Sequence, residues 1–180
     1  MFKHHKMRKR YPDVKIGRHS QVSKDTTIGA HSYIGLNCFV TKAQIGRYVS
    51  IGNFASIGNG EHDLNRVSTA SMFYENGYDV LTKGDCIIEA DVWIGVDAII
   101  RRGVRLGHGC VVGANSFVNK DIPPFAIAVG SPAKIVGYRF DDAETRDAIL
   151  ASHWWEKEPD AARAVIEKLE ADLGLSGTSA

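Results

Sequence analysis

The sequence has little that would suit a secreted, membrane-spanning or nucleic-acid-binding protein. It holds only three cysteines in 180 residues, an odd number without a CxxC pair, so we expect a reduced, cytoplasmic protein without a disulfide framework. No run approaches the roughly 18 apolar residues that a membrane span requires. Positive and negative side chains number 22 and 21, and this balance removes the electrostatic argument for a nucleic-acid partner.

The first ten residues are the exception to this balance, because five of them are lysine or arginine. No apolar run follows them, which argues against a secretory signal. We predict a basic N-terminal arm over residues 1–13. It could be a plain solvated segment or an electrostatic handle for a polyanion.

A hydrophobic period of six residues runs through most of the chain. Isoleucine, leucine or valine stands at fourteen positions of one register, with one step of five residues and one long gap: Ile16, Val22, Ile28, Ile34, Val40, Ile45, Ile51, Ile57, Ile88, Ile94, Ile100, Leu106, Val112 and Val118. Glycine directly follows nine of them, and a small or branched residue commonly stands four places after. Two inward positions in six residues favour a short strand and a corner, because a helix would need a period of 3.6.

Three such hexapeptides would close a triangular coil, and stacked coils would form parallel sheets on three faces of a prism. The glycine column indicates either positive φ or a close approach of backbones. We predict an all-β domain over residues 14–140, with about two and a half coils in 16–61 and about two in 88–122. A thin prism leaves flat faces exposed, which favours a three-fold assembly.

The period fails between Ile57 and Ile88, and there we predict an extruded loop over residues 59–87. Long excursions from a rigid scaffold commonly carry function, although a plain surface loop would give the same pattern. Three aromatic side chains in it could stack on an acceptor or pack against another subunit: Phe73, Tyr74 and Tyr78.

The chain after Val118 changes pattern twice. Pro123 and Pro124 cannot continue the ladder, and we expect the chain to return and pack four aliphatic side chains on the last coil: Ile127, Val129, Ile135 and Val136.

Residues 141–175 are then predicted to form a C-terminal helical segment. Asp141 with Glu144 suggests a helix cap, Pro159 suits a first helical position, and Gly174 suits a helix end.

His62 is the first candidate for chemistry, because it stands at the mouth of the loop and a histidine can accept a proton at neutral pH. The residues alone leave it open as a general base or a structural histidine, and do not indicate which group would orient its ring. Three other histidines, His19, His31 and His108, follow inward aliphatics by two or three places and are expected to point outward at corners.

Basic and aromatic residues offer further candidates. Lys120, Lys134 and Arg139 lie around the end of the second repeat block, where they could hold phosphates or simply be solvated. Trp93 directly precedes an inward isoleucine, so its ring should lie outside the prism, at a subunit interface or a ligand.

The stretch DVWIGVDAIIRRGVRLGHGCVVGANSFVNKDIPPFAIAVGSPAKIVGYRF resembles the hexapeptide acyltransferases. The loop sequence GNGEHDLNRVSTASMFY is similar to that of their sugar and capsular-polysaccharide O-acetyltransferases. The segment LTKGDCIIEADVWIG, with the later RFD and WW residues, is similar to the xenobiotic acetyltransferases that act on chloramphenicol and streptogramin. The resemblance implies a left-handed parallel β-helix and acetyl-CoA as co-substrate, with no metal required.

The resemblance also implies a homotrimer with active sites between neighbouring subunits. The family's catalytic histidine matches His62, which would take the proton from an acceptor hydroxyl. That hydroxyl would attack the thioester of acetyl-CoA directly, without an acyl-enzyme. The implied cofactor-binding residues are Trp93, Gly113, Ala114, Asn119, Lys120, Lys134 and Arg139. Asn119 departs from the family, which usually has threonine there.

The leading hypothesis from the sequence is acetyl transfer to a hydroxyl of a sugar or polysaccharide. Acetylation of an antibiotic hydroxyl and N-acetylation of an amino sugar are alternatives on the same site. A metal-dependent carbonic anhydrase on the same prism is a remote alternative, because it would need His31, His62 and His108 to meet one metal. A structural hexapeptide subunit without enzymatic activity is a further possibility.

Overall fold

The computed structural model describes residues 10–175, so positions 1–9 of the predicted basic arm lie outside the described residues. The chain divides into two compact units, Met1–Tyr138 and Arg139–Ala180. This boundary lies close to residue 140, where we predicted the end of the β domain.

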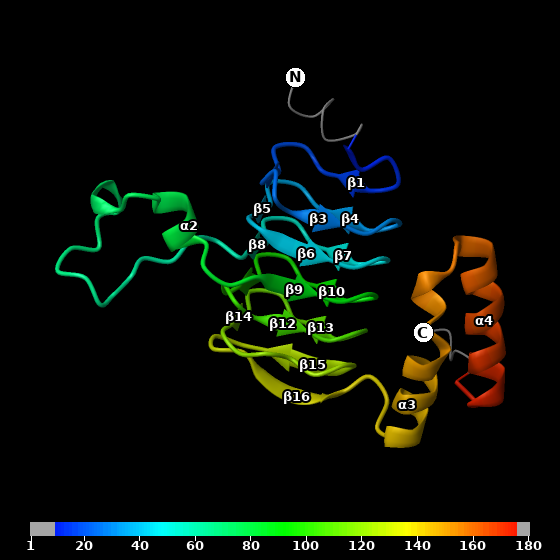
Figure 1. Ribbon diagram of the computed structural model, residues 1–180. Helices are drawn as coiled ribbons and strands as arrows, with labels where there is room; N and C mark the ends of the chain where they lie inside the picture. Colours follow the sequence, from blue (N-terminus) through cyan, green and yellow to red (C-terminus); the bar gives the residue numbers. More distant parts are fainter. Residues whose placement is uncertain (1–9, 176–180) are drawn as a thin grey trace. The chain divides into compact units, whose positions relative to one another are not determined.

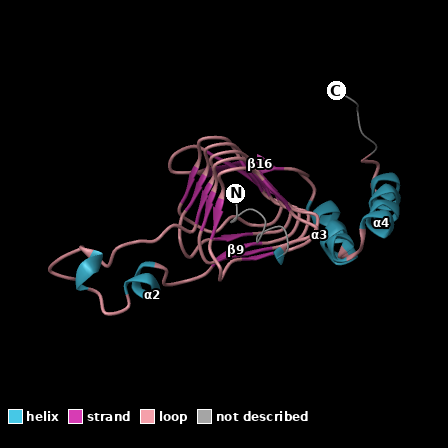
Figure 2. Ribbon diagram, turned by 90° about the horizontal axis from the view of Figure 1, so that it is seen from above, coloured by secondary structure: helices cyan, strands magenta, loops and turns pink. Residues whose placement is uncertain are grey.

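The first unit is a prism of short strands that wind coil upon coil around three faces (Figure 1). Seen along its axis, the prism has a triangular outline (Figure 2). Face A contains β1 (Lys15–Ile16), β4 (Tyr33–Ile34), β7 (Ser50–Ile51), β10 (Trp93–Ile94), β13 (Val111–Val112), β15 (Ala126–Val129) and β16 (Lys134–Tyr138). Face B contains β2 (Gln21–Val22), β5 (Phe39–Val40), β8 (Ser56–Ile57), β11 (Ile99–Ile100) and β14 (Phe117–Val118). Face C contains β3 (Thr27–Ile28), β6 (Ala43–Ile45), β9 (Cys86–Ile88) and β12 (Arg105–Leu106).

The strand register follows the predicted hexapeptides. Ile94 pairs with Val112, eighteen residues later, so one coil consists of three hexapeptides. Ile34 pairs with Ile51, seventeen residues later, because the coil between them contains the five-residue step. Within residues 10–175 face A has six parallel strands, so the prism is taller than the sequence predicted.

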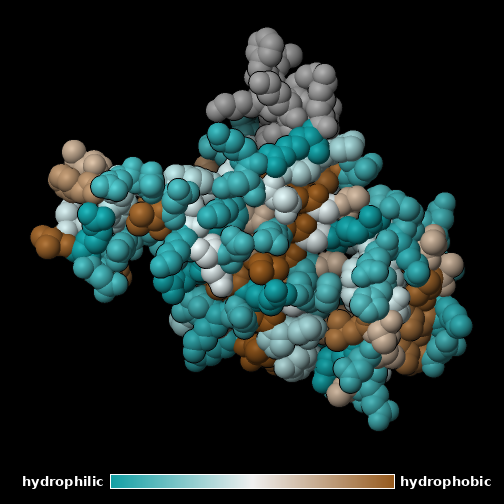
Figure 3. Space-filling model, viewed as in Figure 1, coloured by the Kyte–Doolittle hydropathy of each residue, from teal (hydrophilic) through white to brown (hydrophobic). Residues whose placement is uncertain are grey.

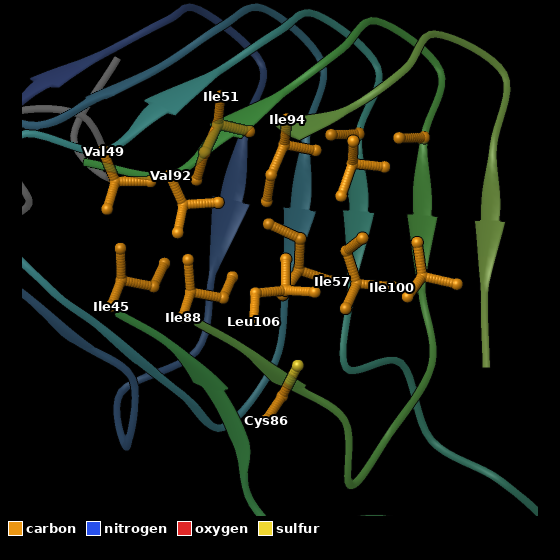
Figure 4. Packing of buried hydrophobic residues seen from close by; sticks show 14 of the residues in the cluster. Ile45, Val49, Ile51, Ile57, Cys86, Ile88, Val92, Ile94, Ile100 and Leu106 are labelled. Carbon is orange, nitrogen blue, oxygen red and sulfur yellow. The ribbon is translucent and has the colours of Figure 1, made fainter. Parts of the chain in front are cut away.

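The aliphatic column fills the interior of the prism, as predicted (Figure 4). Ile51, Ile57 and Ile94 are fully buried, with 0% of their surfaces exposed. The small or branched residues that stand four places after the aliphatics, which we call the small column, also point inward. They include Cys38, Val49, Ala55, Val92, Ala98 and Cys110. Two inward side chains from each hexapeptide therefore form continuous ladders from coil to coil.

The glycine column makes room for the neighbouring coil. A Cβ on Gly17 would lie 2.3 Å from the carbonyl oxygen of Gly35, and one on Gly95 would lie 2.6 Å from the amide nitrogen of Ala114. Positive φ falls two residues later, at corner residues such as His19 (64°) and Asn115 (56°). The sequence left two reasons for the glycine column, positive φ and close approach of backbones. At most of these glycines the reason is close approach.

The return of the chain after the two prolines forms an antiparallel hairpin of β15 and β16. The prediction that the aliphatics of this segment pack on the last coil was wrong for Val129, Ile135 and Val136, which are 38%, 44% and 64% exposed, while Ile127 is half-buried. The register pairs Ala128 with Val112, so Ala126 and Ala128 face the interior instead and are fully buried.

The second unit contains α3 (Ala143–Ser152), the 3-10 turn η2 (Trp154–Glu156) and α4 (Pro159–Asp172). Pro159 begins α4 as predicted, and Gly174 follows its end with a φ of 65°. Asp142 rather than Asp141 caps α3, because its Oδ2 accepts a hydrogen bond from the amide of Thr145 (2.7 Å). Among residues 10–175, no helix combines the length and hydrophobicity that crossing a membrane requires.

The repeat is interrupted by one long excursion, which we define as residues 58–85. It leaves the prism after β8 and returns at β9, so the last two residues of the predicted loop already belong to a strand. It contains the 3-10 turn η1 (Ser71–Phe73) and the short helix α2 (Gly77–Leu81), and it projects away from the prism (Figures 1 and 2).

Candidate active site

His62 lies on the outgoing arm of the excursion, and a backbone carbonyl orients its exposed ring. Its Nδ1 lies 2.5 Å from the carbonyl oxygen of Thr69. A carbonyl oxygen can only accept a hydrogen bond, so Nδ1 carries the proton in this contact. In the neutral ring, Nε2 then presents a lone pair to the solvent. This tautomer suits a general base.

Tyr74 fixes the carbonyl that orients His62. It is buried at 7% exposure. Its hydroxyl donates to the same Thr69 oxygen and accepts from the amide of Asp63, both at 3.2 Å. The guanidinium of Arg66 lies over the Tyr74 ring, 4.9 Å from its centre. The tyrosine that the sequence offered as an acceptor-binding residue thus supports the turn that contains Thr69.

A cavity of about 320 Å³ lies beside His62, and its lining includes Glu61, Asp63, Lys83 and Arg102. The Glu61 carboxylate forms a two-pronged ion pair with Arg101, whose Nε and a terminal nitrogen each lie 2.6 Å from one carboxylate oxygen. Arg102 is buried and donates to backbone carbonyls. Charged side chains therefore line this cavity together with Val80 and Leu81, and the Glu61 carboxylate is already paired.

Tyr78 lies on α2 and ties the excursion to the first coil. Its hydroxyl lies 2.9 and 2.8 Å from the two carboxylate oxygens of Asp25. Burial and the hydrogen bond to Asp25 raise the pKa of Tyr78. Desolvation opposes the shift at Asp25, but hydrogen bonds from Ser23 and Tyr78 outweigh it and lower the pKa of that carboxyl. Of the three loop aromatics, Phe73 is the most exposed, at 59%.

The predicted cofactor residues lie on different faces and corners. Trp93 projects from β10 on face A and is 55% exposed, so the prediction that its ring lies outside the prism is confirmed. Gly113 and Ala114 follow β13 at the corner between faces A and B. The Gly113 amide donates to the carbonyl of Ala128 (2.9 Å), which leaves that N–H occupied within the ladder. Lys134 begins β16 at the same face as Trp93.

Asn119 and Lys120 follow β14 at the corner between faces B and C, which is also the corner that the excursion leaves after β8. Strands β8, β11 and β14 are consecutive neighbours on face B, so the residues that follow them share one edge. His62 is therefore on the arm that departs from the edge of Lys120, whereas Trp93 is on another face. Arg139 begins the second unit, and its guanidinium lies 5.3 Å from the centre of the Phe140 ring.

The three cysteines are buried free thiols. Burial raises the pKa of Cys86 to about 12, with Arg102 opposing the shift, and burial also raises the pKa of Cys38. A nucleophilic cysteine has to be a thiolate. Neither environment favours one.

The three histidines of the carbonic anhydrase alternative lie apart, because His31 and His108 are on the prism and His62 is on the excursion. His31 packs against the Tyr48 ring with 5.0 Å between ring centres, and His108 Nδ1 accepts from the amide of Ala90 (3.1 Å). Both are at the corner between faces C and A, away from the corner of His62. In the described part of the chain, no three His, Cys, Asp or Glu side chains are placed to hold a metal ion.

Sequence reasoning did not find Thr69, Arg101 or Arg102. The Thr69 contact is made through the backbone, and no side-chain pattern could have indicated it. Arg101 could have been singled out from the sequence, because it directly follows an inward aliphatic residue, a place that glycine occupies nine times.

The bacterial transferase hexapeptide (six repeats) family model matches residues 85–120. A chloramphenicol acetyltransferase of Klebsiella aerogenes is 34% identical over 176 residues, which cover 88% of this chain and 82% of that protein. A probable macrolide acetyltransferase of Lysinibacillus sphaericus is 32% identical over 73% of this chain and 82% of its own length. A hexapeptide-repeat acetyltransferase of Vibrio cholerae, solved in complex with acetyl coenzyme A, is 28% identical with a TM-score of 0.57 over 78% of each chain.

Proposed function

Because the chain belongs to the hexapeptide-repeat acetyltransferases, which are acetyl-CoA-dependent enzymes built on a left-handed β-helix, we propose that it acetylates a hydroxyl group of a small acceptor with His62 as the general base. The observation that carries this proposal is the hydrogen bond from His62 Nδ1 to the Thr69 carbonyl. It holds the ring in the tautomer whose Nε2 can accept a proton.

In the proposed reaction, His62 Nε2 takes the proton of the acceptor hydroxyl while that oxygen forms a bond to the thioester carbonyl carbon of acetyl-CoA. The Thr69 carbonyl stabilises the resulting imidazolium, because it accepts from Nδ1–H in both protonation states. The carbon–sulfur bond then breaks, and His62 returns its proton to the departing thiolate. The buried thiols with raised pKa values support direct transfer without an acyl-enzyme.

We further propose a homotrimer with the active sites between subunits. Trp93 and Lys134 are on one face, and His62 is on an arm that leaves another corner, so a neighbouring copy would be needed to bring these groups together. Large apolar side chains exposed on the prism support such an association: Tyr33, Leu36, Phe39, Phe54, Trp93, Val96 and Ile99. Asn119, Lys120 and Lys134 are proposed to meet the phosphate and adenine end of acetyl-CoA, whereas Arg139 begins the second unit and stays a prediction from the sequence.

The relatives favour an acceptor of the chloramphenicol kind, because chloramphenicol acetyltransferases match most of the chain. A sugar or polysaccharide hydroxyl is the second candidate, since the exposed rings of Phe73 and Trp93 could stack on a pyranose as well as on an aromatic acceptor. Chloramphenicol, a streptogramin, neutral oligosaccharides and amino sugars form the panel that separates these acceptors and separates O- from N-acetylation.

The test of the proposed base is His62→Ala, assayed by acetyl-CoA consumption on the best acceptor of that panel. We expect turnover to fall by about 10² or more, with unchanged oligomeric state and thermal stability. His19→Asn is the matched control, because His19 has a φ of 64° at a corner where Asn37 and Asn115 adopt similar values. A His62→Ala enzyme as active as His19→Asn would contradict the assignment.

A further inference from the structure

Two consecutive arginines stand where the excursion meets the prism. Arg101 and Arg102 directly follow β11, which pairs with β8, the strand that precedes the excursion. The outgoing arm contains Glu61 and His62, and the returning arm ends at β9. Both arms thus pass the same corner, and each of them contacts one of the two arginines.

Arg101 holds the outgoing arm through Glu61. Its two nitrogens lie 2.6 Å from the two carboxylate oxygens, a fork geometry that fixes direction as well as distance. The amide of Glu61 also donates to the carbonyl of Leu81 at the end of α2 (2.8 Å). The residue directly before His62 is therefore held from its side chain and from its backbone.

Arg102 holds the returning arm in a different way. Its side chain is buried at 8% exposure and donates to the carbonyls of Thr41 (2.6 Å), Lys42 (2.8 Å) and Gly84 (3.2 Å). A Cβ on Gly58 would lie 3.1 Å from the guanidinium, so glycine at that position leaves room for it. Arg102 joins two coils to the end of the excursion and has a structural role.

The Arg101–Glu61 pair has the features of a positioning contact instead. The two side chains are 49% and 38% exposed, and exposed ion pairs contribute little to stability. The repeat does not call for an arginine here, because glycine occupies this column at nine of its fourteen positions. Among residues 10–175, Glu61 is the side chain that Arg101 bonds. The pair holds the residue directly before His62 and so orients the backbone that leads to His62.

We propose that Arg101 is a positioning residue for acetyl transfer: by holding both oxygens of Glu61, it sets where the His62 imidazole stands against the acceptor hydroxyl. This inference rests on the proposed role of His62 as the base. A small misplacement of a catalytic group lowers the rate of the chemical step more than it weakens binding. Loss of the pair should therefore lower kcat and leave KM for acetyl-CoA unchanged.

The experiment compares Arg101→Gln, Glu61→Gln and the double variant with the wild-type full-length enzyme, using steady-state kinetics with acetyl-CoA and the best acceptor. We expect each single variant to lower kcat about tenfold. We expect the double variant to be no slower than either single one, because both remove the same contact. Arg101→Lys keeps the charge without the fork and should recover part of kcat.

Arg105→Gln is the matched control. Arg105 also pairs with a glutamate, Glu89, and is similarly exposed at 52%, but it lies on face C. We expect its kcat to equal that of the wild type. Thermal melts of all variants separate a loss of position from a loss of folding, and Glu61→Gln keeps nearly the same shape if Arg101→Gln fails to fold.

The dependence of kcat on salt concentration distinguishes a positioning role of the Arg101–Glu61 pair from a purely structural one. Screening weakens an exposed ion pair, so added salt should lower kcat of the wild type more than that of Arg101→Gln. Wild-type kcat in Arg101→Gln, or rate losses of the two single variants that multiply in the double variant, would overturn the proposal while leaving the function intact. Full activity in His62→Ala would instead contradict the proposed function itself.

Discussion

The prism and the excursion are stabilised by different kinds of interaction. In the prism, the aliphatic and small columns are buried from Ile34 onward, the first coil is partly buried, and every coil is hydrogen-bonded to the next. In the excursion, the large apolar side chains of Leu64, Val67 and Met72 are 83%, 111% and 81% exposed, and hydrophobic surface is visible on the part that projects from the prism (Figure 3). Its connections to the prism include several polar contacts, among them Glu61 with Arg101, Tyr78 with Asp25, and Lys42 with the carbonyl of Thr82.

This difference explains why the proposed base is not part of a coil. Each inward position of the repeat is constrained by the coils above and below it, so a catalytic side chain there would have to satisfy the packing of a ladder. The excursion is free of that constraint and is held by a few directional contacts. The proposed base therefore lies apart from the side chains that fill the core of the prism.

The largest expected effect comes from blocking the approach of two coils. Gly95→Val places a branched side chain where a Cβ alone would lie 2.6 Å from the amide nitrogen and 2.9 Å from the Cα of Ala114. Backbone cannot yield as a side chain can, so we expect a loss of about 4 kcal/mol or more in unfolding free energy. Urea denaturation measures it. Gly137→Ala is the control, because nothing lies within 4 Å of its Cβ position, and a similar loss there would contradict the reasoning.

A truncation in each region tests the comparison directly. Ile100 is 1% exposed inside the prism and Val67 is fully exposed on the excursion. We expect Ile100→Ala to lower the unfolding free energy by about 2–5 kcal/mol and Val67→Ala to change it by less than about 0.5 kcal/mol. The unfolding free energy of both variants is measured by chemical denaturation at equal protein concentration. Equal losses would show that the excursion is packed as tightly as the core.

The same division limits what the sequence could predict. The columns of the prism are visible because each position repeats in its neighbouring coils, so the strands, the inward aliphatic residues and the outward Trp93 follow from local spacing. The sequence did not predict the last coil, because alanines (Ala126 and Ala128) stand there in place of the isoleucine, leucine and valine residues that mark the register. The cap of α3 is Asp142 and not Asp141, because either of two adjacent aspartates can cap a helix and the glutamate three residues after Asp141 favoured the wrong one.

The candidate site was predictable only in part. His62 could be singled out by its place at the mouth of the excursion, but its partner could not, since Thr69 contributes only a carbonyl. Arg101 and Glu61 are forty residues apart, and their contact exists only because β11 lies beside β8. Contacts that depend on how a single, non-repeating segment folds back leave no period in the sequence to detect.

The smallest expected effect comes from the tie between α2 and the first coil. Tyr78→Phe removes the hydroxyl that bonds both oxygens of Asp25. Since the contact is exposed, we expect a stability change of about 1 kcal/mol or less. Limited proteolysis is more sensitive than melting here, because cleavage reports local opening of the excursion. Tyr33→Phe, on an outward and exposed tyrosine of face A, is the control and should be cleaved like the wild type.

The pH dependence of this tie follows from the two pKa shifts. The pKa of Asp25 is lowered from 3.8, so the carboxylate form and its hydrogen bond persist at neutral pH and are lost as the pH falls through the lowered pKa. The pKa of Tyr78 is raised from 10.0, so its hydroxyl keeps its proton until still more alkaline pH. We therefore expect the difference in cleavage rate between Tyr78→Phe and the wild type to be constant from about pH 5 to 9. A difference that vanished within this range would mean that another contact holds α2 to the prism.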